Sequence, residues 1–212
     1  RTYADLFLKL SKDSSINRNK LYFYDLNVKL NYQLGKRDQL FLSGYFGRDV
    51  MGMQDKFGLA WGNGTGTIRW NHVYGPKLFS NTSLIFSNYN YEVSAKTESD
   101  DFTVFSQIRD WNVKQDFQWY LNPRNTIQFG INAIHHTIRP GEVTASKTSG
   151  IGEGRLQKRY AWENAAFISN NWKASEKLTL SYGLRLTAFS VLGEGDFYTI
   201  DKNGKVIDTT SY

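Results

Sequence analysis

With 212 residues, the chain is long enough for one domain or at most two, and its lack of cysteine excludes disulfides, zinc–thiolate centres and thiol chemistry. The net charge of +6 comes from lysines and arginines scattered along the chain, without a basic stripe or a recognised motif, so no nucleic-acid partner is expected. Apolar residues make up 40%, and no run approaches the roughly 18 consecutive apolar residues that a membrane-spanning helix needs. Aromatic residues nevertheless reach 16%, and amphipathic tyrosine and tryptophan rings collect at membrane–water interfaces.

Residues 22–34 carry the clearest pattern in the N-terminal part of the chain. The even positions are all tyrosine, leucine or valine, whereas the odd positions are almost all polar. Since successive side chains of a strand face opposite sides, this pattern predicts a β-strand with one apolar face. Such a strand exceeds the usual roughly 5–6 residues and suits a tilted membrane strand, which needs about 9–11. Residues 1–10 are expected to hold a short helical turn in a loop or, alternatively, a further strand.

The same alternation recurs along the chain and predicts eight long strands. It is clear at residues 110–121, 127–133 and 178–188, and further strands are expected near 39–48, 66–74, 80–95 and 158–172. The predicted fold class is therefore all-β, an antiparallel transmembrane β-barrel, with a soluble sandwich or lipocalin-type barrel as the alternative. The polar positions expected to face a lumen are Asp25, Asn27, Lys29, Asn31, Asn112, Lys114, Asp116, Gln118, Gln128, Asn132 and Arg185.

The connections between these strands fall into two kinds. Short turn-forming clusters occupy residues 35–38, 75–77, 122–125 and 173–176, and longer polar or glycine-rich stretches cover 49–64, 96–107, 139–157 and 192–212. Outer-membrane barrels have short periplasmic turns and longer extracellular loops, so the long stretches are expected outside. Both ends of the chain would then lie outside, on the wrong side for a complete barrel. Residues 1–212 are therefore expected to be part of one larger transmembrane barrel domain, since an open sheet leaves backbone groups unpaired in lipid.

No combination of residues indicates catalysis, a metal site or a cofactor. His135 and His136 are neighbours on a strand, so their rings are expected on opposite faces instead of on one ion. The glycine clusters at 62–66 and 150–154 lack the setting of a phosphate loop and are interpreted as flexible loops. The acidic residues lack the spacing of a calcium loop and are interpreted as a solvated loop edge; they are Asp100, Asp101 and Asp110.

Ligand capture is expected from residues of the long outer stretches. Arginine and aromatic side chains there can stack and form charge-assisted contacts with a ligand. The candidates are Arg48, Asp49, Trp61, Arg139 and Arg155. The chain is not expected to be an enzyme, because no nucleophile–base or paired-carboxylate arrangement can be argued from the spacing.

Several runs of residues resemble the barrel of TonB-dependent outer-membrane receptors, particularly those of the Bacteroidota. The first two are YFYDLNVKLNY at 22–32 and DQLFLSGYFGRD at 38–49. The others are WENAAFI at 162–168 and LTLSYGLRL at 178–186. The resemblance touches most of the chain and lies in the cadence of strand, short turn and strand, although each piece alone is degenerate. No plug domain, no segment that contacts the energy-transducing protein and no terminal aromatic strand is recognised in the sequence.

This resemblance implies a 22-stranded outer-membrane barrel whose lumen is filled by a plug domain of the same parent protein. It also implies active import of a scarce nutrient such as a siderophore, haem, glycan or peptide, powered through the TonB complex. Outer-membrane lipid is the expected surrounding, and a surface lipoprotein is a further partner that the resemblance allows. The alternatives are a passive porin or channel and a structural or adhesive barrel.

Overall fold

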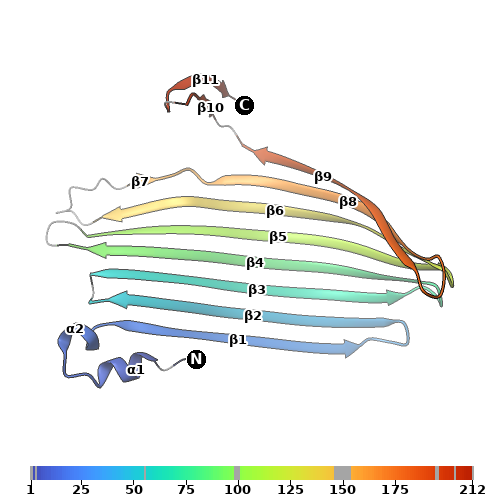
Figure 1. Cartoon of the computed structure of the whole chain (residues 1–212), viewed down its shortest axis with the longest axis horizontal. Helices are drawn as coiled ribbons and strands as arrows, with labels where there is room; N and C mark the ends of the chain where they lie inside the picture. The colour runs from blue at the N-terminus through green and yellow to red at the C-terminus, as the bar shows by residue number, and fades with distance from the viewer. Residues whose placement is uncertain are drawn as a thin grey trace.

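The computed structural model describes residues 2, 4–54, 56–97, 101–145, 154–193, 196–202 and 204–211. Its main feature is one antiparallel sheet whose eight long strands lie side by side in sequence order (Figure 1). These strands are β1 (Lys20–Gln33), β2 (Asp38–Met53), β3 (Phe57–Val73), β4 (Leu78–Lys96), β5 (Asp101–Asn122), β6 (Asn125–Ala145), β8 (Arg159–Lys173) and β9 (Thr179–Leu192). The two-residue strand β7 (Gly154–Arg155) pairs with β6. The prediction of an all-β antiparallel fold with eight long strands is confirmed.

Two short helices precede β1. The helix α1 (Ala4–Lys9) confirms the helical turn expected in residues 1–10, whereas α2 (Ser14–Asn17) was not expected. The Asp13 carboxylate caps α2 by accepting hydrogen bonds from the Ser15 hydroxyl at 2.7 Å and the Ser15 backbone N–H at 2.8 Å. These two bonds hold the pKa of Asp13 below its usual value because they stabilise the charged form. In the described part of the chain, no helix is long and apolar enough to cross a bilayer.

The pairing register gives the sheet one apolar face and one polar face. Apart from register shifts at the two ends of the β5–β6 pairing, the pairings between neighbouring long strands join residues of the same face, so the apolar side of β1 continues across the sheet to β9. Three successive rows of the apolar face start at Val28, Leu30 and Tyr32 on β1 and end at Ser190, Ala188 and Leu186 on β9. None of these three rows contains Asp, Glu, Lys or Arg, as a lipid-facing band requires.

The apolar side chains of this face are exposed. Leu26 is 62% exposed, Leu184 80% and Leu186 77%. Among the described residues, only Ala161 and Ala165 are buried hydrophobic side chains. A soluble sandwich or lipocalin-type barrel would bury one face of its sheet in a core. This single layer instead presents its apolar residues outward, which is the arrangement of a barrel wall in contact with lipid.

The four short turns lie together at one end of the strands, here called the turn end (Figure 1). They join β1 to β2, β3 to β4, β5 to β6 and β8 to β9, as the sequence predicts. Backbone hydrogen bonds close them, for example from Leu34 N to Asp38 O at 3.0 Å and from Tyr74 N to Leu78 O at 3.0 Å. The opposite end of the strands is called the far end.

The structure corrects the expectation of long loops at the far end. Strand β2 continues to Met53 and β3 begins at Phe57, so only residues 54–56 connect them; likewise β5 begins at Asp101 and β6 runs to Ala145. The stretch 192–212 contains a separate hairpin of β10 (Asp196–Ile200) and β11 (Val206–Ser211). Backbone pairing does not require an apolar face, so polar and glycine-rich segments extend the ladder beyond the apolar rows. The stretches that look like long loops at the far end are therefore largely continuations of the strands.

Arginine at Val28 is expected to destabilise the folded barrel of the intact protein. Val28 lies midway between Tyr24 and Tyr32 on the apolar face. A guanidinium at the bilayer midplane costs about 2–4 kcal/mol. The measurement is the free energy of unfolding in urea after reconstitution in lipid vesicles. Asn27→Arg is the matched control on the polar face and should cost less, and equal losses at the two positions would contradict the assignment of the faces.

Candidate functional site

The polar face of the sheet is the candidate functional surface. All eleven residues that the sequence predicts for a lumen lie on this face, because pairs such as Lys114–Asn132, Gln118–Gln128 and Phe167–Arg185 are joined by the register. Side chains from β1 to β5 line a single cavity of about 510 Å³ on it. Strands that are not neighbours can share one cavity only if the face curves inward there. The polar face is therefore concave.

The cavity carries excess positive charge. Its charged lining residues are Lys29, Arg69, Lys114 and Asp116. Lys114 Nζ pairs with Asp116 Oδ2 at 2.8 Å, while the guanidinium of Arg69 lies 4.4 Å from the centre of the Phe41 ring. Among the described residues, neither Lys29 nor Arg69 has a carboxylate within ion-pair distance. The cavity is therefore suited to an anionic group, such as a carboxylate of a ligand or of an acidic side chain.

Buried acceptor atoms without a donor gather beside this cavity. Asn112 Oδ1, Asp116 Oδ1 and Asn132 Oδ1 have no hydrogen-bond partner among the described residues, and neither has Asn63 Oδ1 farther along the polar face. An unsatisfied buried polar atom costs about 1–3 kcal/mol. These oxygens can thus accept hydrogen bonds from a polar partner that covers the polar face.

A cluster of three titratable side chains lies farther toward the far end of the polar face. His136 Nδ1 on β6 is 2.8 Å from Asp110 Oδ1 on β5, and His136 Nε2 is 3.8 Å from Glu163 Oε2 on β8. His135 faces the other side, where the centre of its ring lies 5.1 Å from the centre of the Trp162 ring. The prediction that the two histidines diverge is therefore confirmed. Asp110 lies within β5, which corrects its interpretation as a loop edge. Sequence reasoning missed this cluster because its members meet only through the strand register.

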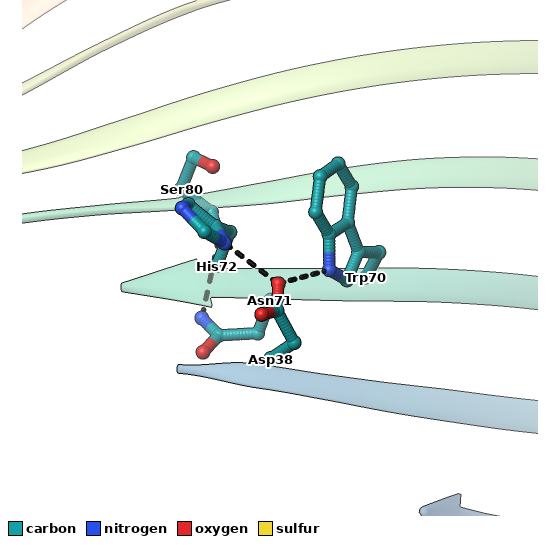
Figure 2. Close-up of polar contacts among 5 residues, drawn as sticks. All are labelled: Asp38, Trp70, Asn71, His72 and Ser80. Atoms are coloured by element: carbon teal, nitrogen blue, oxygen red, sulfur yellow. Dashed lines mark hydrogen bonds and ion pairs between the residues drawn. The ribbon is translucent and has the colours of Figure 1, made fainter. Parts of the chain in front are cut away.

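A second polar cluster lies at the turn end (Figure 2). Asp38 Oδ1 accepts a hydrogen bond from Trp70 Nε1 at 2.9 Å, and His72 Nδ1 lies 2.6 Å from the same oxygen. These three side chains belong to the apolar face, whereas Asn71 projects to the polar face and donates to the Ser80 carbonyl at 3.2 Å. Aromatic rings with a polar tip are typical of the membrane–water interface. The cluster marks where the apolar face ends.

The five residues expected in ligand-binding loops lie in strands. Asp49 on β2 is directly opposite Trp61 on β3, on the polar face. Arg48 is opposite Gly62 and Arg139 is opposite Gln107, both on the side that carries the apolar rows. Arg155 belongs to β7, where it is the strand-pairing partner of Glu142 on β6. The expectation of loops is thus corrected for all five residues, and the face of the sheet separates Asp49 and Trp61 from Arg48 and Arg139.

The remaining sequence candidates are the two glycine clusters and the acidic pair Asp100–Asp101. Residues 62–66 belong to β3, which corrects their interpretation as a flexible loop. Asp101 begins β5 and pairs with Lys96 at 3.5 Å. Asp100 and residues 150–153 of the second glycine cluster lie outside the described residues, and Gly154 begins β7. Within the described ranges, no group of three histidine or acidic side chains could hold a metal ion.

Comparison with known proteins identifies the fold. No protein-family model and no curated protein sequence matches the chain. The structure is similar to the copper transporter OprC, with a TM-score of 0.65 and 11% identity over 94% of this chain and 34% of that one. It is also similar to BauA, the ferric preacinetobactin receptor from Acinetobacter baumannii, with a TM-score of 0.57 and 8% identity over 94% of this chain and 44% of that one. The chain has the fold of a segment of an outer-membrane β-barrel, and it spans less than half the length of these two chains.

Alanine at Gly130 is expected to destabilise the barrel. A Cβ there would contact the Gln115 carbonyl oxygen too closely and would lie 3.0 Å from both Asp116 Oδ1 and Phe167 Cε1. Such overpacking costs about 1–3 kcal/mol. The urea midpoint of the reconstituted intact protein should therefore fall. Gly66→Ala is the control, since a Cβ there meets nothing within 4 Å; a midpoint that falls equally for both variants would contradict the close approach at Gly130.

Proposed function

We propose that this chain forms part of the barrel wall of a TonB-dependent receptor that actively imports a scarce nutrient across the outer membrane. The observation that carries the proposal is the similarity of nearly the whole chain to the folds of a transporter and a receptor. The two contrasting faces of the sheet support it, because a barrel needs an apolar band toward lipid and a polar interior. An import function, and not an enzymatic one, is consistent with the two similar structures being a transporter and a receptor.

In this proposal, the apolar face contacts lipid and the eleven predicted polar residues line the lumen. The turn end lies in the periplasm and the far end outside the cell. Further strands of the parent barrel, 22 in all by the family resemblance, would pair with the open edges of β1 and β9. An unpaired edge inside lipid would cost several kcal/mol for each backbone group.

A plug domain of the parent protein is the proposed cover of the polar face. Its polar groups would donate to Asn112, Asp116 and Asn132, and its acidic side chains would meet Lys29 and Arg69. The TonB complex would supply the energy for transport, and a surface lipoprotein could close the outer side. Asp49 and Trp61 are the proposed ligand contacts of the polar face at the far end, where a charged group and an indole stand opposite each other. The proposed ligands are a siderophore, haem, a glycan or a peptide, and the receptor is of the Bacteroidota type.

The proposal is tested by uptake through the intact protein. Growth on the transported nutrient, or accumulation of its labelled form, should require both this protein and the proton motive force. Deleting the energy-transducing protein should abolish uptake. Uptake that persists without the proton motive force would identify a passive channel, and surface adhesion without any uptake would identify an adhesive barrel.

Charge reversal in the cavity is expected to loosen the plug. In the intact protein, Lys29→Glu combined with Arg69→Glu replaces two cations that face the proposed acidic side chains with anions. Cells that carry this variant should become severalfold more sensitive to vancomycin, which is too large for ordinary porins. The measurement is the minimal inhibitory concentration at matched levels of folded protein. Lys36→Glu combined with Arg37→Glu reverses the same charge in the β1–β2 turn and should leave sensitivity unchanged; equal sensitivity of both variants would contradict docking of the plug at the cavity.

A further inference from the structure

The charges of the apolar face are ordered just beyond its uncharged rows. The next two rows toward the far end pass through Leu26 and Tyr24 on β1. Their only charged residues are arginines, namely Arg48 on β2, Arg109 on β5 and Arg139 on β6. The next acidic residue of this face on β4 is Glu92, one row farther out. The two rows that border the uncharged rows on the far-end side therefore contain arginines and no acidic residue.

Two of these arginines form a compact polar group on neighbouring strands. The register places Asn88 opposite Arg109, and it places Gln107 opposite Arg139. Gln107 Nε2 donates to Asn88 Oδ1 at 2.7 Å, so the two amides between the arginines bind each other. Arg109 is exposed, while Arg139 and Arg48 are partly exposed. Among the described residues, none of the three arginines has a carboxylate within ion-pair distance.

The position of the arginines beyond the uncharged rows fits lipid headgroups. Arg48 stands two residues beyond Phe46, and Arg109 stands two residues beyond Trp111, whose ring packs on Phe86 at 4.8 Å. Two residues of a strand tilted by about 40° rise about 5 Å along the membrane normal. Long arginine side chains near the edge of an apolar band extend their charged ends toward the interface, so guanidinium groups one or two rows beyond the uncharged rows reach the phosphate level.

We propose that Arg48, Arg109 and Arg139, here called the arginine band, bind phosphate groups of outer-leaflet lipid, the phosphates of lipid A. Guanidinium forms two parallel hydrogen bonds to phosphate, and its weak hydration favours such contacts at an interface. The band extends over strands β2 to β6, which spans about 19 Å at about 4.8 Å per strand. This width suits a broad lipid with more than one phosphate better than a single free anion. The inference depends on the proposed membrane orientation and not on transport.

The test is lipid binding to the intact protein purified in detergent. Native mass spectrometry titrates bis-phosphorylated lipid A against its dephosphorylated form. Wild-type protein should bind the phosphorylated lipid, and Arg109→Gln combined with Arg139→Gln should weaken that binding roughly thirtyfold, from about 1 kcal/mol for each cation near an anionic surface. Lys36→Gln combined with Arg37→Gln removes the same charge from the β1–β2 turn at the opposite end of the sheet and should leave the affinity unchanged.

Several outcomes would overturn the inference. Equal binding of phosphorylated and dephosphorylated lipid A to wild-type protein would exclude phosphate recognition, even if the double variant failed to fold. Competition by inorganic phosphate at equal concentration would indicate a free-anion site. Preference for phosphatidylglycerol over lipid A would place the band in the inner leaflet. Each result is independent of uptake, so failure of the transport proposal would show separately.

Discussion

An antiparallel register that runs through the central part of every strand keeps residues of one parity on the same side of the sheet from β1 to β9. Irregularities in the β5–β6 pairing, between Phe105 and Gln107 and between Tyr120 and Asn122, lie at its two ends. A slip by one residue in any pairing would exchange the apolar and polar faces of every strand beyond it. In lipid, backbone groups must be paired within the protein, so strands must continue through the whole apolar band. Pairing and parity together produce a wall with two chemically opposite surfaces.

The functional groups of the polar face follow from this register. Asp110, His136 and Glu163 come from three strands, and each is separated from its partner by many residues in the chain. The same holds for the cavity, where Lys29 and Asp116 meet across four pairings. No strand contains either group by itself. The curved sheet assembles both groups, and the buried oxygens of Asn112 and Asn132 beside them leave acceptors for a covering partner.

The sequence pattern could predict the part of each strand that lies in the apolar band. Residues 22–34 alternate with Phe23 as the exception, because each even side chain meets the apolar environment, and glycine, proline or asparagine marks most short turns. Beyond the apolar rows lipid no longer requires this alternation, so the sequence of residues 49–64 and 96–107 looks like loops, although residues 49–53, 57–64 and 101–107 belong to strands. The contact between Asp110 and His136 could not be predicted, since it depends on the register of β5 and β6.

Arg48 and Asp49 show that a shift of one residue along a strand decides which face of the sheet a side chain joins. They are neighbours in the chain and look alike as polar residues of an outer segment, yet the register places Arg48 beyond Phe46 on the apolar face and Asp49 opposite Trp61 on the polar face. One is positioned for the surrounding lipid and the other for whatever enters the barrel. Because β2 and β3 keep their parity through their extended segments, this part of the wall continues to separate lipid contacts from ligand contacts outside the apolar band. A flexible loop at the same place would not maintain that separation.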